Sequence, residues 1–113
     1  MEVLHRLTGT EILSLIRSRQ ISATEATRSC LDRIDSLDPK LQAFRIVLRQ
    51  EALARAGSVD RELARGADPG PLAGLPLAVK DVICLAGHPT TCGSRILRDF
   101  VPCFDATVID RLR

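Results

Sequence analysis

Lys80 is the residue of this sequence whose setting most suggests chemistry. It stands beside Asp81 in the middle of a short apolar run at 77–83. An apolar setting lowers the pKa of a lysine toward neutrality, and the neutral amine then serves as a general base. Only one other lysine, Lys40, occurs among the 16 basic residues, so a cation that is readily deprotonated is rare here. The alternative is a surface cation, either on an exposed strand edge or paired with Asp81 or another carboxylate.

A loop of small, hydrogen-bonding residues follows at positions 87–94, with the sequence Gly-His-Pro-Thr-Thr-Cys-Gly-Ser. Gly93 permits a close approach of the backbone to another group, and the alternative is an ordinary surface connection. Cys92 is a nucleophile by residue type, but a thiol needs an activating base within reach, and only His88 is near in sequence. We therefore do not expect a catalytic cysteine. All four cysteines are expected to be free and mostly buried: Cys30, Cys84, Cys92 and Cys103.

Composition excludes several classes of function. The chain has 113 residues and is 45% hydrophobic, which suits one modest domain with a buried core. Its net charge is +2 and it has three Phe but no Trp or Tyr, so direct nucleic-acid binding is not expected. No apolar run approaches the length of a membrane span and the N-terminus lacks the features of a signal peptide, so we expect a cytoplasmic protein. The two histidines lie far apart and no Cys-x-x-Cys pair occurs, so no metal site is expected.

Three N-terminal helices are predicted from capping signals and apolar spacing. Thr8 and Ser22 are each followed three positions later by a glutamate, which is the capping box that opens a helix. The first helix is predicted to end near Arg19, and the second is predicted to stop at Asp38-Pro39. A third is predicted over 51–65, just before a glycine. The second helix is expected to bury one apolar face, made of Ala23, Ala26, Cys30, Ile34 and Leu37.

Strands are predicted where apolar and β-branched residues form short runs. The first run covers 43–48, and the second is the run 77–83 that carries Lys80. Near the C-terminus, Asp105 is expected to cap a last helix that carries the apolar residues of 108–112.

Four stretches of the sequence together resemble one protein family. Residues 71–83 read Pro-Leu-Ala-Gly-Leu-Pro-Leu-Ala-Val-Lys-Asp-Val-Ile, and residues 90–97 read Thr-Thr-Cys-Gly-Ser-Arg-Ile-Leu. Phe-Val-Pro at 100–102 and Asp-Ala-Thr-Val-Ile-Asp-Arg-Leu at 105–112 follow. With the N-terminal helices, these stretches resemble the amidase signature family over nearly the whole chain. Within the family, the similarity is greatest to the members that serve tRNA-dependent amidotransferases.

The resemblance implies an α/β fold in which helices are followed by strands of a large mixed sheet. Residues 1–113 would then be the N-terminal portion of a single amidase domain. We expect 1–66 to be mainly helical, and 67–113 to hold the lysine-bearing strand, the Thr-Cys-Gly-Ser loop and the start of a helix. A chain that ends here would leave apolar faces uncovered and strand edges unpaired, so these residues are expected to be poorly stable alone.

The resemblance also implies amide hydrolysis by a Ser–cis-Ser–Lys triad, without a cofactor or a metal. One serine attacks the amide carbonyl, a second serine relays a proton, and the lysine is the base. Lys80 matches that lysine, whereas the two serines belong to a Gly- and Ser-rich segment that these residues do not contain. Thr91, Cys92, Gly93 and Ser94 match a loop that lies near the active site in the family. This loop does not supply the nucleophile. Without its serines, the chain is expected to be inactive by itself.

Three functions follow as expectations. The complete protein would release ammonia from glutamine for the transamidation of Glu-tRNA(Gln) or Asp-tRNA(Asn), with partner subunits of the amidotransferase handling ATP and tRNA. A stand-alone amidase that acts on small carboxamides is the alternative with the same chemistry. An alternative of a different class is a non-catalytic truncated remnant or interaction module, in which the amphipathic N-terminal helices pack on a partner and Lys80 is a surface cation.

Overall fold

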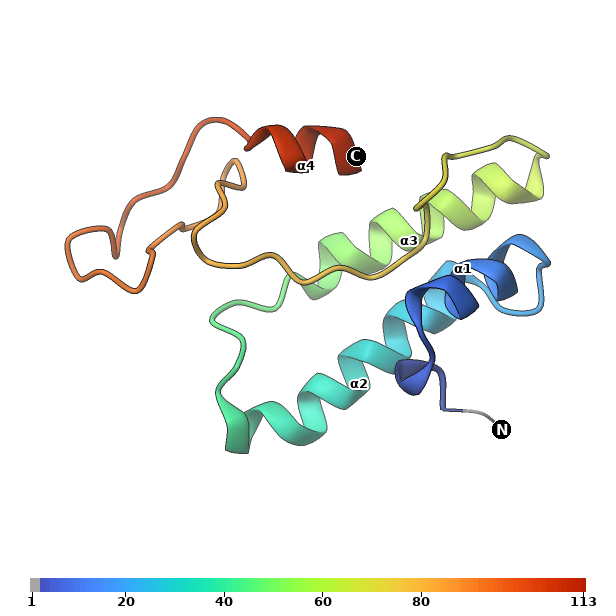
Figure 1. Ribbon diagram of the computed structural model, residues 1–113, viewed down its shortest axis with the longest axis horizontal. Helices are drawn as coiled ribbons and strands as arrows, with labels where there is room; N and C mark the ends of the chain where they lie inside the picture. Colours follow the sequence, from blue (N-terminus) through green and yellow to red (C-terminus); the bar gives the residue numbers. More distant parts are fainter. Residues whose placement is uncertain (1–2) are drawn as a thin grey trace. The chain divides into compact units, whose positions relative to one another are not determined.

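The computed structural model describes residues 3–113, which form two compact units (Figure 1). The elements are the 3-10 helix η1 (Leu4–Arg6) and the α-helices α1 (Gly9–Arg17), α2 (Ala23–Leu41), α3 (Arg49–Ala64) and α4 (Thr107–Leu112). The first unit extends to Pro76 and contains the helices η1 to α3. The second extends from Leu77 to Arg113 and contains Lys80 and α4. None of the helices between residues 3 and 113 is long and apolar enough to cross a membrane.

The two predicted capping boxes are present at the starts of α1 and α2. The Thr8 hydroxyl accepts a hydrogen bond from the N–H of Glu11 at 3.3 Å, and the Glu11 carboxylate accepts the N–H of Thr8 at 2.7 Å. Ser22 and Glu25 make the same pair of hydrogen bonds at 3.0 and 2.7 Å. In both boxes the backbone N–H of the capping residue, followed by its hydroxyl, lowers the pKa of the glutamate that accepts it. Local sequence therefore determines where both helices begin.

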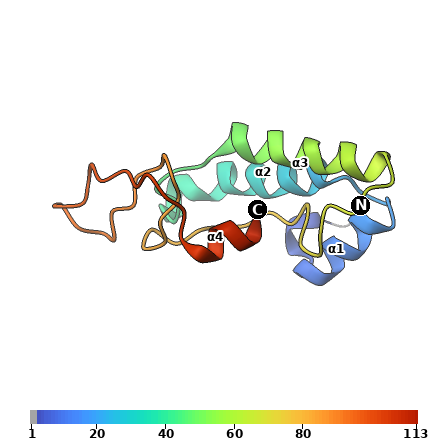
Figure 2. The same ribbon diagram turned by 90° about the horizontal axis from the view of Figure 1, so that it is seen from above.

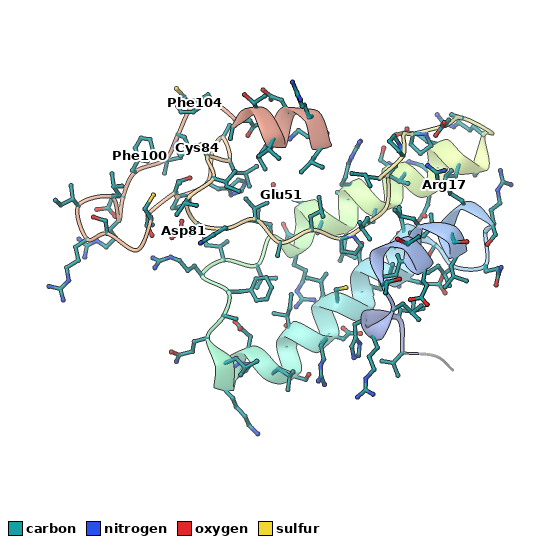
Figure 3. The ribbon with its side chains drawn as sticks, in the orientation of Figure 1. Arg17, Glu51, Asp81, Cys84, Phe100 and Phe104 are labelled. Carbon is teal, nitrogen blue, oxygen red and sulfur yellow. The ribbon has the colours of Figure 1, made fainter. Side chains whose placement is uncertain are left out.

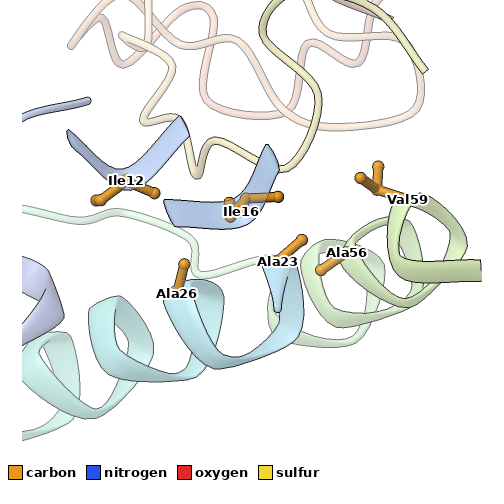
Figure 4. Packing of buried hydrophobic residues seen from close by; sticks show 6 residues of the cluster. All are labelled: Ile12, Ile16, Ala23, Ala26, Ala56 and Val59. Atoms are coloured by element: carbon orange, nitrogen blue, oxygen red, sulfur yellow. The ribbon is translucent and has the colours of Figure 1, made fainter. Parts of the chain in front are cut away.

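The core of the first unit lies where α1 meets the antiparallel pair α2 and α3. Figure 2 shows α2 and α3 packed along each other, and Figure 4 shows the buried side chains between the three helices. These are Ile12, Ile16, Ala23, Ala26, Ala56 and Val59. The predicted face of α2 is confirmed at Ala23 and Ala26, whereas its continuation through Cys30 is only half-buried. Leu31, which the prediction left out, is 4% exposed.

Asp60 of α3 fastens the first turn of α2. Its carboxylate accepts the N–H of Ala23 at 2.7 Å, the N–H of Thr24 at 3.1 Å and the hydroxyl of Thr24 at 2.6 Å. The first N–H groups of a helix have no partner within the helix, and its N-terminus carries a partial positive charge. The carboxylate satisfies these donors and complements that charge. Its hydrogen bonds therefore join α3 to α2 in addition to the apolar packing between the two helices.

Gly74 lies in the segment that returns over this core after α3. Its φ of +89° is in the left-handed region, and a Cβ there would stand 3.0 Å from the Cβ of Ala23 and 3.2 Å from Cδ1 of Ile16. A side chain at this position would therefore meet both backbone strain and crowding.

We expect Gly74→Ala to destabilise the first unit by about 2–4 kcal/mol, because left-handed backbone strain adds to overpacking. Gly70→Ala is the matched control: φ is +106° at Gly70, but a Cβ there would have no neighbour within 4 Å. This control variant should lose only the backbone term, about 1–2 kcal/mol. Urea unfolding of the native gene product measures both losses. Equal losses in the two variants would contradict the crowding at Gly74.

Neither predicted strand forms, so the sheet of the expected α/β fold is not present among residues 3–113. The runs 43–48 and 77–83 are both irregular. Strand N–H and C=O groups need a neighbouring strand as their partner, and none is formed between residues 3 and 113. The apolar side chains of these runs are accordingly exposed, among them Phe44, Ile46, Leu77 and Val82.

Helix α2 passes the predicted stop at Pro39 and ends at Leu41. A proline in the last turn removes only one hydrogen bond of the helix, because it lacks a single N–H donor. Asp38 stabilises the exit: its carbonyl accepts the N–H of Gln42 at 2.7 Å, and its carboxylate accepts the N–H of Ala43 at 2.7 Å. Gln42 has a left-handed φ of 52°, which ends the helix.

Candidate active site

Two segments of the second unit are joined by hydrogen bonds between their backbones. The bonds run from Ala106 N to Cys84 O (2.9 Å), from Gly87 N to Pro102 O (3.0 Å) and from Thr90 N to Phe100 O (3.0 Å). Residues 84–90 and 100–106 therefore run antiparallel, although they form no regular strands. In Figure 3, Cys84 marks the first segment and Phe100 the second.

Asp105 links the two segments and does not cap α4, so the predicted cap was wrong. Its carboxylate accepts the N–H of Ala86 at 2.7 Å and pairs with Arg113 at 2.5 Å, while α4 begins after Ala106 without a side-chain cap. An N–H group buried without a partner is costly. The carboxylate therefore accepts the N–H of Ala86, which is distant in sequence, and not an N–H of the first turn of α4.

Asp81 fastens the Thr-Cys-Gly-Ser loop, residues 91–94, to the residue that follows Lys80. Its carboxylate accepts the N–H of Thr91 at 2.8 Å and, through the other oxygen, a hydrogen bond from the Thr91 hydroxyl. Its carbonyl accepts the N–H of Cys92 at 2.8 Å. We refer to these three hydrogen bonds as the Asp81–Thr91 clasp. Thr91 is 3% exposed, whereas Asp81 is half-buried and Cys92 is exposed, so the clasp is partly buried.

Thr91 also organises the rest of the loop. Its hydroxyl accepts the N–H of Gly93 at 3.2 Å, and its carbonyl accepts the N–H of Ser94 at 2.8 Å. Cys92 and Gly93 both have left-handed backbones, with φ of 51° and 69°. A non-glycine residue in this region is uncommon and costs free energy, so the surrounding hydrogen bonds must hold it.

Lys80 is exposed in a turn that closes with a 2.9 Å hydrogen bond from Ile83 N to the Lys80 carbonyl. The flanking apolar residues Val79 and Val82 are exposed as well. The structure thus brings the Lys80 segment and the Thr-Cys-Gly-Ser loop together through Asp81, but the second unit does not enclose the lysine. From sequence, Asp81 was expected only as an ion-pair partner for Lys80. The clasp was missed because a contact ten residues along the chain depends on how the loop folds.

All four cysteines are free, as predicted, but the expectation that they are mostly buried was wrong. Cys92 and Cys103 are exposed, and Cys30 and Cys84 are only half-buried. Partial burial raises the pKa of the Cys30 thiol. Three of the four belong to the second unit, where the packing that would cover them is sparse.

Known proteins match this chain along nearly its whole length. The Amidase family model matches residues 25–113. The A subunit of the glutamyl-tRNA(Gln) amidotransferase of Acidothermus cellulolyticus is 49% identical over 113 residues, which are 100% of this chain and 22% of that protein. The putative amidase AmiD of Mycobacterium tuberculosis is 44% identical over 112 residues, which are 99% of this chain and 24% of that protein.

The fold matches a solved structure as well. That structure is of a vestigial protein complex that reveals the evolutionary origins of an s-triazine catabolic enzyme. One of its chains is 34% identical to this one with a TM-score of 0.88, and the match covers 94% of this chain and 23% of that one. This chain therefore spans about a quarter of the length of the proteins it matches. The family model covers most of the sequence, and the chain belongs to the amidase family.

Proposed function

We propose that Lys80 is the general base of a Ser–cis-Ser–Lys site that hydrolyses an amide. The observation that carries this proposal is the Asp81–Thr91 clasp, which holds the Thr-Cys-Gly-Ser loop beside the Lys80 segment. Two stretches that the family resemblance assigns to one active site are thereby joined by hydrogen bonds. Thr91, Cys92, Gly93 and Ser94 would line the site without supplying the nucleophile.

In this proposal, residues 1–113 are the N-terminal portion of a single amidase domain, and both serines lie outside them. The first serine attacks the amide carbonyl as its proton passes through the second serine to the amine of Lys80. The proton then leaves with the departing ammonia, and water releases the acyl group from the serine. An amine accepts a proton only in its neutral form. The exposed Val79 and Val82 beside Lys80 supply apolar surface that would enclose the amine once further parts of the domain cover it.

Glutamine is the proposed substrate, and the ammonia would serve the transamidation of Glu-tRNA(Gln) or Asp-tRNA(Asn). The support is the 46–50% identity with the A subunits of glutamyl-tRNA(Gln) amidotransferases, along 96–100% of this chain. Partner subunits of the amidotransferase would handle ATP and tRNA. A net charge of only +2 agrees with that division of labour.

A stand-alone amidase that acts on small carboxamides is the second candidate. It is favoured by the 44% identity with the putative amidase AmiD over 99% of this chain. Both candidates use Lys80 in the same way, so they differ in the substrate and in whether partner chains are needed.

Ammonia release by the native gene product, purified with any chains that accompany it, separates the two candidates. We expect glutamine to be preferred over propionamide by about 100-fold or more in kcat/KM, because a site that hydrogen-bonds the amino-acid end of glutamine rejects an amide without it. A preference for propionamide would favour the stand-alone amidase. Release from neither amide would contradict both candidates.

A further inference from the structure

We propose that Asp81 is a positioning residue for the amide-hydrolysing reaction, because it fixes the Thr-Cys-Gly-Ser loop against the segment that carries Lys80. The proposal rests on the proposed function of Lys80. Its basis is the Asp81–Thr91 clasp, in which one carboxylate takes both the N–H and the hydroxyl of the same threonine. Figure 3 labels Asp81, which lies in the turn that begins at Lys80.

The clasp connects the Asp81 carboxylate to the turn of the loop at Cys92 and Gly93. The Thr91 hydroxyl donates to Asp81 and accepts the N–H of Gly93, so the three residues form a continuous chain of hydrogen bonds. A hydrogen bond to an ionised carboxylate is about twice as strong as one between neutral groups. The left-handed turn at Cys92 and Gly93 is therefore anchored at Asp81, directly after Lys80.

The loop has little other support within the second unit. Cys92 and Gly93 are exposed, and nothing lies within 4 Å of the place where a Gly93 Cβ would stand. Hydrogen bonds therefore hold the turn: those of Thr91, and the backbone bond from the N–H of Cys92 to the carbonyl of Asp81. Loss of the carboxylate removes two of the three hydrogen bonds of the clasp and should loosen both the loop and its register with Lys80.

The expected consequence is a loss of rate more than of binding. Reacting groups that are displaced by about 1 Å lose about 100-fold in rate. We expect Asp81→Ala to lower kcat for ammonia release by about 100-fold, and Thr91→Val to lower it by about tenfold, with KM changed less than about threefold in both. Thr91→Ser keeps the hydroxyl and should restore kcat to within about twofold of the native value.

A double-mutant cycle in the native gene product tests whether Asp81 and Thr91 act as a unit. Asp81→Ala combined with Thr91→Val should be no slower than Asp81→Ala alone, because the second change removes a contact that is already lost. Asp105→Ala is the matched control. Asp105 also accepts a backbone N–H in this unit, at 2.7 Å from Ala86, but its carboxylate bonds to Ala86 and Arg113 and not to the loop. The loss of kcat in a variant with both Asp105→Ala and Thr91→Val should equal the product of the losses in the two single variants.

Amide hydrogen exchange supplies a readout that does not depend on turnover. Asp81→Ala should speed exchange at the amides of Thr91 and Cys92 by about tenfold or more, and leave the amides of α2 unchanged. If Asp81→Ala unfolds the protein, Asp81→Asn takes its place. The asparagine oxygen still accepts the N–H of Thr91, but an NH₂ group replaces the oxygen that accepted the Thr91 hydroxyl, and the charge is lost. An intermediate fall in kcat of about tenfold is therefore expected.

Three results would overturn the proposal: a kcat for Asp81→Ala within about threefold of native, multiplicative effects of Asp81→Ala and Thr91→Val, or unchanged exchange at Thr91 and Cys92. Lys80→Ala, assayed in parallel, separates this failure from that of the proposed function. If Lys80→Ala abolishes turnover while Asp81→Ala does not, only the positioning role fails. If Lys80→Ala remains active, or if the native product hydrolyses no amide, the function of Lys80 fails and the positioning role fails with it.

Discussion

Replacement of Lys80 by alanine is expected to lower amide hydrolysis by about 10⁴-fold in the native gene product, while α1, α2 and α3 stay folded. The loss is large because the attacking serine can no longer pass its proton to a base, and general-base catalysis contributes about 10²–10⁴-fold. The fold should survive because the Lys80 side chain is exposed and the core of the first unit contains no part of it. Steady-state ammonia release and circular dichroism on the same preparation check both halves of this prediction.

Lys40→Ala is the control for the loss of a lysine. Lys40 is the other lysine of the sequence and is exposed near the end of α2, so its removal should leave turnover within about twofold of native. A Lys80→Ala variant that turns over as fast as Lys40→Ala would remove Lys80 from the mechanism.

Lys80→Arg separates a role as a base from a role as a cation. A guanidinium keeps its proton at neutral pH, so Lys80→Arg should fail almost as badly as Lys80→Ala. If positive charge were all that the site needs, the arginine variant would retain a substantial part of the native rate. Ammonia release by the two variants under identical conditions therefore tells the two roles apart.

The parts of the fold that could be predicted from sequence are those with local causes. The capping boxes at Thr8 and Ser22 involve residues three positions apart, and both are present as predicted. The third helix needed only apolar spacing and a terminal glycine, and Gly66 has the left-handed φ of +78° that its position suggested. Interactions of this kind depend on the chain within one or two turns, so composition and spacing are sufficient to identify them.

The predictions that failed concern partners distant in sequence. Residues 43–48 and 77–83 have strand composition, but a strand forms only when another strand pairs with it. Asp105 has the residue type of a helix cap, yet its carboxylate serves the N–H of Ala86, which lies 19 positions away. Sequence spacing likewise could not predict that the Asp60 carboxylate bonds to the start of α2, or that Asp81 bonds to Thr91. Tertiary packing decides which donors a carboxylate contacts.

The candidate site was predictable to a similar degree. Lys80 and the Thr-Cys-Gly-Ser loop could be selected from residue type and family resemblance, and the structure brings their segments together through Asp81. The spacing of apolar residues in the sequence could not tell whether Lys80 is enclosed, since the enclosure depends on which surfaces cover Val79 and Val82. Those side chains are exposed among residues 3–113. In the proposed mechanism, the environment of Lys80 therefore depends on the whole domain and not only on the run 77–83.

The 113 residues produced on their own are expected to release no ammonia from glutamine above the uncatalysed background. The proposed nucleophile lies outside them, and a base without a nucleophile to deprotonate gives no covalent catalysis. Ammonia release measured with and without Lys80→Ala provides the test. Turnover that depends on Lys80 would contradict the prediction and would direct attention to Ser94, the serine of the Thr-Cys-Gly-Ser loop, through a Ser94→Ala variant.

The same preparation should also show unequal stability of the two units. The second unit buries few apolar side chains and exposes many large ones: Leu77, Val79, Val82, Ile96, Phe100, Val101, Phe104, Val108 and Leu112. Because apolar burial supplies most of the free energy of folding, amides of 84–106 should exchange with almost no protection while those of α2 and α3 are protected. Strong protection across 84–106 that persists on dilution would show that the Asp81–Thr91 clasp and the hydrogen bond that Asp105 accepts from Ala86 hold this unit without a covering surface.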